Sequence, residues 1–546
     1  MSRWRPSISA ASRGPTVWAR ISGSHACSRG RRAMAGWRAA LLGAAWLVGL
    51  AWDATAQPVL RVGMAAQDVG RLDPHFATST IDRVVVGWMF NGLVRFAPGS
   101  ADPATIEPDL AERWDSSADG KTWTFHLRRG VRFHGNYGEL TAEDVAFSLK
   151  KAGTAASSAF SADFRSIGSV EAVDPYTVRI VLRENVPSLL GILTNYSGGY
   201  IVSKRAAEER GDGFTRAPIG TGPFALDRVT PSQSAELVAH AEYFREAPQI
   251  GRISYRFIPS DASRDLAFQN RELDLNYGRS DQTWVNRMRQ QPGVTVDIFE
   301  PAELAILNLN ITQPPFNDLR VRQALAHAVN RAELVRWRGT DVSREGQSLV
   351  PRGYLGFIEA GVLPHDPVRA RALLAEAGHG SGLTVKVIHT QLPEMLNMMQ
   401  VVQQQLRRAG ITLDLQVVEH ATFHQQIRQD LSPLVYYSAA RFPVADIYLT
   451  QFWHGRSIVK TPTAVTNFSH CSQADAQIDA ARVSTDREEQ LKLWGEAQRI
   501  LVQQVCGVPL VETLLVFARR DALDYGYPLR GSMSLGPPIT ERTRLR

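Results

Sequence analysis

Alternating apolar residues mark β-strands in the first third of the chain. From Lys121 to His134 the apolar positions alternate in two runs on either side of Gly130, which predicts a β-hairpin. Residues 176–182, YTVRIVL, alternate in the same way and predict a further strand.

A strand, a helix and a second strand follow one another in the C-terminal half. Residues 383–390 and 411–418 alternate as strands do, and a helix is expected between them from about Pro393 to Ala409, closed by Gly410. This order is that of a βαβ unit, which predicts an α/β lobe in this half of the chain.

Two more helices are predicted by their capping residues. In residues 314–330, Asn317 or Asp318 caps a run with apolar residues at helical spacing. In residues 365–378, Asp366 caps the helix, Pro367 takes its first position and Gly378 ends it.

The length and the charge limit the class of protein. A chain of 546 residues is too long for one core, so two or three domains are expected. The net charge of +7 suggests nucleic acid, but residues 1–56 hold eight arginines and one acid. The rest of the chain balances 53 basic residues with 53 acidic ones, so no nucleic-acid partner is expected.

The N-terminal segment has the anatomy of a secretory signal. Arginines 31, 32 and 38 precede 14 uncharged residues, Ala39–Trp52. That run is shorter than the ~20 residues that span a bilayer. We therefore expect cleavage after Ala56, a periplasmic location and no stable membrane insertion. Met34 as an alternative start and twin-arginine export at Arg31–Arg32 both stay open.

Outside the signal segment, which contains Cys27, the chain has two cysteines, Cys471 and Cys506. Exported proteins form disulfides, so we expect these two to pair. Two buried free thiols are the alternative.

Motifs for catalysis are missing from the sequence. It has no G-x-S-x-G, no H-E-x-x-H and no G-x-x-x-x-G-K, so no enzyme and no cofactor are expected. Gly220–Pro223 has two glycines, but a proline stands where the helix of a phosphate loop would begin. His420 and His424, after Glu419, are spaced to bind a metal, but a pair is half a site. We expect solvated histidines there and no metal.

Several segments occur together in an order typical of one family. They are LRVGMAAQDVGRLDPHFATST, NGLVRF, EPDLAERWDSSADGKTWTFHLRRGVRFH, LTAEDVAFSLKKA, VEAVDPYTVRIVL, PIGTGPF, ELDL, LNLNITQPPFNDLRVRQALAHAVNR, RALLAEAG and QRILVQQVCGVPL. By these segments, residues 57–520 resemble the bacterial extracellular solute-binding protein family 5, the peptide-, nickel- and opine-binding components of ABC importers.

The resemblance implies an α/β fold: a two-lobed periplasmic binding protein of class II, from the large cluster with an extra inserted subdomain, acting as a hinged clamp. Residues 1–56 would be the extension and signal. The main subdomain of lobe 1 would comprise residues 57–92, 218–304 and 512–546, with 93–217 inserted and 305–511 as lobe 2. Hinge strands would cross near Leu307–Asn310 and Val508–Glu512.

Residue 441 departs from the family pattern. In peptide-binding relatives this loop carries an aspartate that holds the ammonium of the peptide, whereas this chain has Arg441. A guanidinium repels an ammonium and binds a carboxylate through two parallel hydrogen bonds. We therefore expect a small polar, anionic solute anchored by Arg441, with Tyr436, Tyr437 and Phe442 as aromatic walls. An ion pair of Arg441 with Asp446 or another acid is the alternative.

Two other loops approach the ligand in relatives. They hold the remaining candidate ligand-binding residues, which are His75, Phe76, Thr78, Ser79, Asn276 and Tyr277. For each of these residues, a position in a loop that does not contact the ligand is an equally good interpretation.

The resemblance implies a monomeric, non-catalytic receptor that hands a small-molecule solute to an inner-membrane ABC permease. A dipeptide or oligopeptide ligand is the first alternative. A secreted hydrolase, and a chemoreceptor or chaperone-like partner using the same clamp, are alternatives from other classes.

Overall fold

The computed structural model describes residues 58–155, 158, 160–161, 163–186, 189–460, 466–484 and 486–546. The expected signal segment, Cys27 and the cleavage after Ala56 lie outside these residues. Within the described ranges, no helix combines the length and the apolar composition needed to cross a membrane.

A nine-stranded mixed sheet is the largest in the described part of the chain. Its order is β16-β12-β17-β11-β1-β10-β9-β8, and β13 pairs with β17. The strands are β1 (Val59–Met64), β8 (Phe224–Thr230), β9 (Ser234–Ala239), β10 (Arg252–Phe257), β11 (Leu275–Tyr277), β12 (Val294–Leu309), β13 (Ser343–Glu345), β16 (Leu434–Ala439) and β17 (Gly507–Arg520). Residues far apart in the chain thus meet in one sheet.

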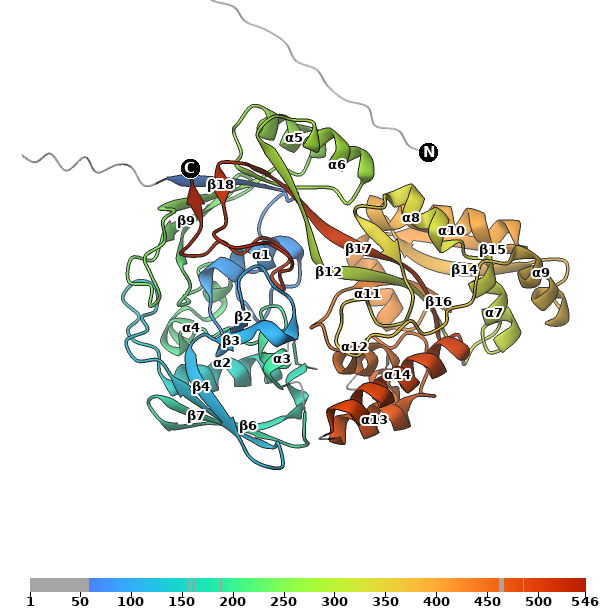
Figure 1. Cartoon of the computed structure of the whole chain (residues 1–546), viewed down its shortest axis with the longest axis horizontal. Helices are drawn as coiled ribbons and strands as arrows, with labels where there is room; N and C mark the ends of the chain where they lie inside the picture. Colours follow the sequence, from blue (N-terminus) through green and yellow to red (C-terminus); the bar gives the residue numbers. More distant parts are fainter. Residues whose placement is uncertain are drawn as a thin grey trace, which may run out of the picture. The chain divides into compact units, whose positions relative to one another are not determined.

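The strands β12 and β17 run antiparallel over most of their length, from Val294 opposite Arg520 to Asn308 opposite Gly507, and Figure 1 shows them side by side. The side chains of a strand point alternately to its two faces. Leu304 and Ile306 of β12 accordingly enter one apolar core, and Ala305 and Leu307 enter a second. The two faces of β12 therefore pack into two different apolar cores.

A four-stranded antiparallel sheet lies in the segment before residue 217. Its order is β4 (Ala111–Ser116), β5 (Thr122–Leu127), β7 (Thr177–Leu182) and β6 (Ile167–Asp174), and α2 (Ala142–Thr154) packs on β6. The predicted strand at 176–182 is confirmed, but the predicted hairpin around Gly130 is wrong. Both edges of β5 are occupied by β4 and β7, so Val131 and Phe133 instead bury their side chains from a loop.

The predicted βαβ unit is confirmed. Strands β14 (Leu383–Thr390) and β15 (Ile411–Val418) pair in parallel, and α10 (Pro393–Arg408) connects them. The two capped helices are α7 (Leu319–Ala328), with Asp318 at its N-cap, and α9 (Pro367–Glu376), with Asp366 at its N-cap. All of these elements contribute to the second core.

The remaining elements surround these sheets. The helices are α1 (Thr80–Met89), α3 (Leu189–Thr194), α4 (Lys204–Arg210), α5 (Asp261–Gln269), α6 (Gln282–Arg289), α8 (Arg331–Arg338), α11 (His420–Arg428), α12 (Ala445–Trp453), α13 (Asp475–Val483) and α14 (Arg487–Gln503). Single 3₁₀ turns lie at Pro103–Thr105, Asp163–Ser166, Gly211–Thr215 and Gly455–Ser457. Short strand pairs join β2 (Val94–Phe96) to β3 (Ile106–Pro108) and β18 (Leu523–Asp524) to β19 (Arg544–Leu545).

A disulfide joins Cys471, before α13, to Cys506, just before β17. Their Cα atoms are 5.8 Å apart and both residues are buried. These are the two cysteines that the sequence analysis pairs.

Gly220 and Gly222 have a packing role. A Cβ atom at either position would collide with the backbone of Met89 at the end of α1, and with Phe90 beside it. These glycines permit a close approach of two backbone segments, as glycine does elsewhere. The structure gives the pair no helix N-terminus on which to hold a phosphate.

Candidate functional site

Arg441 lies directly after β16, where the chain turns toward α12. Its backbone N–H donates to the hydroxyl of Tyr354 at 2.7 Å, and the same hydroxyl donates to the Arg441 carbonyl at 2.7 Å. The guanidinium donates from Nε to Gln451 Oε1 at 2.6 Å and from Nη1 to the carbonyl of Ala440 at 2.7 Å. These bonds use two of the five N–H donors of the side chain, so it is held in place and retains donors for another partner.

Asp446 is not the partner of Arg441. The Asp446 carboxylate is buried and accepts from Arg482, with 3.1 Å between Nε and Oδ1. The ion pair with Asp446 that the sequence leaves open for Arg441 is therefore wrong.

Hydrogen bonds connect the Arg441 loop to the segment around α3. The hydroxyl of Tyr196 donates to the carbonyl of Ala440 at 2.6 Å, and the backbone N–H of Phe442 donates to Asn195 Oδ1 at 3.1 Å. Asp163 accepts from Asn195 Nδ2 at 2.8 Å and also from Gln451 Nε2. These contacts join residues that the predicted domain boundaries place in different lobes.

Phe442 forms an apolar contact in the same region. Its ring lies against Gly191 of α3, where any Cβ atom would overlap the ring, and its centre is 5.7 Å from that of Phe96. Because Phe442 is only 2% exposed, its position is that of a packing residue between segments.

A second arginine, Arg83 on α1, lies near Arg441. Its guanidinium carbon is 3.9 Å from the ring centre of Tyr196, and its Nε donates to the carbonyl of Ala77 at 3.4 Å. Burial lowers the pKa of Arg83, and the positive charge of Arg441 lowers it further. Arginine stays protonated through such shifts, so two like charges are held in proximity.

A carboxylate, Glu303 on β12, faces the same region. It accepts a long hydrogen bond of 3.4 Å from the hydroxyl of Ser438. Burial raises the pKa of Glu303, while Ser438 and the charges of Arg338, Arg441 and Arg83 lower it. Arg338 has its Nε buried without a hydrogen-bond partner among the described atoms.

We call Arg83, Glu303, Arg338 and Arg441, with Tyr196 and Tyr437, the Arg441 cluster. Among the described residues, none of its four charged side chains forms an ion pair with another side chain. Buried or half-buried charges are costly unless they are paired. The cluster therefore offers positive charges that can pair with a carboxylate of a solute. It also offers one negative charge that can pair with an ammonium.

Several of the predicted ligand residues have contacts outside this cluster. His75 is fully buried, and its ring contacts Lys151 Nζ at 3.3 Å and the carbonyl of Tyr200 at 3.0 Å. Phe76 packs under the same Lys151, whose Nζ is 4.4 Å from the ring centre. These residues belong to a network around Lys151, and their predicted contact with the solute stays a prediction.

Other candidates have equally defined local contacts. Ser79 caps α1 by accepting from the N–H of Asp82, and Thr78 beside it is exposed. Asn276 is fully buried and donates to Asp265 Oδ1 at 3.2 Å.

The predicted tyrosines divide into two groups. Tyr436 is buried, with its ring centre 5.4 Å from that of His389. Tyr437 and Tyr277 are half-buried. The ring centre of Tyr437 is 5.9 Å from that of Phe452, over which the Arg441 guanidinium lies. Burial, followed by the charge of Glu303, raises the pKa of Tyr277 to about 12. Tyr277 therefore borders the Arg441 cluster, to which Tyr437 belongs, and Tyr436 belongs to the second core.

Sequence reasoning missed Arg83, Glu303, Asp163 and Gln451. Arg83 and Gln451 look like ordinary polar positions on amphipathic helices. Glu303 gave one signal, because it interrupts the mostly apolar run FEPAELAILNL of β12.

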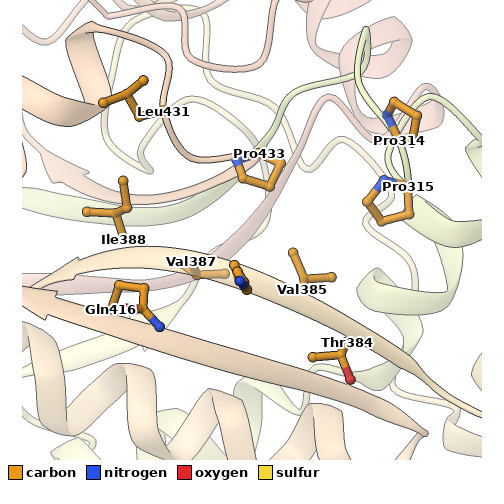
Figure 2. Close-up of a pocket in the computed structure, with 10 residues that line it drawn as sticks. Pro314, Pro315, Thr384, Val385, Val387, Ile388, Gln416, Leu431 and Pro433 are labelled. Carbon is orange, nitrogen blue, oxygen red and sulfur yellow. The ribbon is translucent and has the colours of Figure 1, made fainter.

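A separate hollow of about 410 Å³ lies beside β14 (Figure 2). Its lining consists of Pro314, Pro315, Pro433, Leu431, Ile388, Val385, Val387, Thr384, Gln416 and Lys386. Lys386 is its one charged residue, so this hollow lacks the converging polar groups that orient a small solute. A smaller hollow, of about 110 Å³, is bordered by Tyr196 and Phe96.

His420 and His424 are not the solvated pair that the sequence predicts. Both are half-buried at the start of α11, and burial lowers the pKa of His424 to about 4. Within the described ranges, no group of three or more His, Cys, Asp or Glu side chains is arranged to hold a metal.

Comparison with known proteins identifies the class. The family model of bacterial extracellular solute-binding proteins, family 5, matches residues 105–459, more than half of the chain. The di/tripeptide-binding protein 2 of Pseudomonas aeruginosa is 29% identical over 462 residues, covering 79% of this chain and 85% of that protein.

Solved structures are similar along almost the whole chain. The binding protein MoaA of A. tumefaciens R10, in complex with mannopinic acid, is 53% identical with a TM-score of 0.84, covering 90% of this chain and all of that one. DppA of Helicobacter pylori, in complex with the peptide STSA, is 25% identical with a TM-score of 0.77, covering 89% and 98%.

The fold and the charged cluster thus define a two-lobed solute-binding protein of the periplasmic type. The chain belongs to the bacterial extracellular solute-binding proteins, family 5, the solute receptors of ABC importers. Its similar proteins are solute-binding proteins rather than enzymes.

Proposed function

We propose that this protein captures a small zwitterionic acid of the opine class, with more carboxylate than ammonium groups, for import. The observation that carries the proposal is the Arg441 cluster, in which three arginines and Glu303 lie close together and form no ion pair with another described side chain. The 53% identity to a structure that contains mannopinic acid supports the same class of solute.

Each charged residue has a role in this proposal. Arg441 and Arg83 bind a carboxylate, since the planar guanidinium offers two parallel N–H donors. Glu303 binds the ammonium of the solute, and Arg338 compensates a second carboxylate. Tyr437 and Tyr277 form aromatic walls beside these groups.

A dipeptide or tripeptide is the second candidate. Glu303 favours it, because a carboxylate on a central strand could hold the N-terminal ammonium of a peptide. The similarity to the di/tripeptide-binding protein of Pseudomonas aeruginosa points in the same direction. Arg441 and Arg83 argue against a peptide ligand, because they repel an ammonium that lies near α1 and the end of β16.

The export route and the partners belong to the same proposal. Residues 1–56 direct secretion and are removed after Ala56, and the mature chain acts as a periplasmic monomer without catalytic activity. Residues 305–511 form one lobe and the rest of the mature chain the other, with 93–217 inserted. The two lobes close around the solute, as the domains of periplasmic binding proteins do. The closed protein then delivers the solute to an inner-membrane ABC permease.

Thermal-shift measurements test the proposal directly. A solute that binds the folded chain raises its melting temperature with concentration. We expect mannopinic acid and related opines to raise it, and neutral sugars and amino-acid amides to leave it unchanged. A concentration-dependent shift with peptides alone would support the second candidate and contradict the first.

A further inference from the structure

The two histidines at the start of α11 point their ring nitrogens at each other. His420 and His424 are four residues apart, so they lie on the same side of the helix. Their Nε2 atoms are 3.2 Å apart, and the ring planes are inclined by 79°.

A separation of 3.2 Å suits two ligands of one ion. Bonds of about 2.0–2.1 Å from a metal to each imidazole nitrogen place the two nitrogens at this distance when the angle at the metal is about 100°. That angle falls between those of tetrahedral and octahedral coordination.

The surroundings orient His420 for this role. Its Nδ1 is 3.0 Å from the hydroxyl of Thr390, at the end of β14. When Nδ1–H donates to that hydroxyl, the lone pair of the ring lies on Nε2 and faces His424. Hydrogen bonds of this kind to the second ring nitrogen fix the tautomer of metal-binding histidines.

His424 brings a second, independent observation. Its Nδ1 is buried and has no hydrogen-bond partner among the described atoms, so Nε2 is the only ring nitrogen that is engaged. The rings of Phe423 and Tyr437 stand edge-on to it, with centres 5.4 Å and 6.1 Å away, and hold its orientation.

We propose that His420 and His424 form a binding site for one borderline transition-metal dication, such as Ni²⁺, Zn²⁺ or Cu²⁺. The two Nε2 atoms supply two ligands, and water supplies the others. Imidazole suits these metals, whereas Mg²⁺ and Ca²⁺ prefer oxygen ligands.

The nearby charges limit the strength of the site. Glu419 uses one carboxylate oxygen to cap α11, accepting from the N–H groups of Ala421 and Thr422 at 2.8 and 3.1 Å. Arg428, one turn after His424, contributes a positive charge that opposes the ion. Two protein ligands with one opposing charge predict a weaker site than the closed four-ligand sites of structural zinc.

Isothermal titration of the tag-free chain from residue 57 with NiCl₂ and ZnCl₂ tests the site. We expect one ion per chain, at least about tenfold weaker binding in His424→Gln and in His420→Gln, and a smaller loss in Thr390→Val. His327→Gln and His365→Gln are matched controls, because these histidines contact backbone carbonyls of another segment, and they should bind as the wild type does. Equal binding by the wild type and His424→Gln would overturn the proposal.

X-ray absorption of the nickel-loaded wild type provides a test without any variant. The proposal expects two imidazole nitrogens at about 2.0–2.1 Å, the range of metal–histidine bonds. A shell with fewer than two imidazoles would contradict it, and so would a stoichiometric response to MgCl₂ in place of NiCl₂. Both measurements use the chain freed of co-purified solute, because Tyr437 of the Arg441 cluster also contacts His424.

Discussion

Arg482 on α13 donates from Nε to Asp446 Oδ1 at 3.1 Å, so the acid nearest in sequence to Arg441 is already engaged. Arg441 is held instead by Gln451 and by the carbonyl of Ala440, which are neutral acceptors. A side chain that is positioned by neutral groups keeps its positive charge available. The proposed role of Arg441 as a ligand anchor requires such an arrangement.

Replacing Arg441 should abolish most of the affinity for an acidic solute. Removing one partner of a buried, hydrogen-bonded charge pair costs about 2–5 kcal/mol, which is a loss of at least about 30-fold. Titration calorimetry of Arg441→Ala should show this loss, with a smaller one in Arg441→Lys. The exposed Arg228→Ala is the control and should bind normally. Unchanged affinity in a folded Arg441→Ala protein would refute the anchor.

Tyr196→Phe should weaken binding modestly. The substitution removes the hydroxyl that donates to the carbonyl of Ala440 and leaves that carbonyl with Arg441 Nη1 as its remaining donor. A neutral hydrogen bond contributes about 0.5–1.5 kcal/mol, so we expect an affinity about 2- to 10-fold lower, mainly through faster solute dissociation. Stopped-flow measurements of release check this, and a dissociation rate equal to that of the wild type would show that the bond plays no part in closure.

Asp163 should make the stability depend on pH. Burial raises its pKa from 3.8 to about 6, although Arg441, Asn195 and Arg83 act in the opposite direction. The folded state therefore binds this proton more readily than the unfolded state does. Its contribution to stability is complete below pH 3.8 and is lost as the pH rises through about 6.

Melting temperatures of the wild type and of Asp163→Asn, measured from about pH 4 to 7, should reveal the contribution of Asp163 to stability. The melting temperature of the wild type, relative to that of Asp163→Asn, should fall as the pH rises through this window. Two parallel pH profiles would mean that Asp163 titrates as it does in the unfolded chain.

The disulfide should contribute to stability. Cys471 and Cys506 close a loop with a sequence separation of 35 residues. Closing a loop of this length stabilises the folded state by about 3–4 kcal/mol in the chain-entropy account. Replacing both cysteines by serine should lower the urea midpoint accordingly. Thiol titration of the unfolded, unreduced chain from residue 57 should find no free thiol, and two reactive thiols would refute the bond.

Local elements were predictable where short-range chemistry decides them. Asp318 and Asp366 cap their helices as expected, and β14 and β15 pair around α10. The hairpin at Gly130 failed because strand partners come from distant segments. Alternation predicts that Phe125 lies in a strand, but it does not indicate that β4 and β7 occupy both edges of that strand.

The site was predictable only in part, for the same reason. Arg441 could be found because it stands at a position where peptide-binding members of the family have an aspartate. Arg83 and Glu303 lie more than 130 residues from Arg441 in sequence, and only the packing of α1, β12 and the loop after β16 brings their charges together. The buried contacts of His75 with Lys151 and with the carbonyl of Tyr200 also join distant segments, so the sequence could not predict them.

The most direct test of the central claim is titration calorimetry of the chain from residue 57, freed of co-purified solute, with mannopinic acid and with the dipeptide Met-Leu. The account predicts saturable one-site binding of mannopinic acid that is lost in Arg441→Ala, and no heat of binding for the dipeptide. Saturable binding of the dipeptide, with mannopinic acid silent, would contradict it.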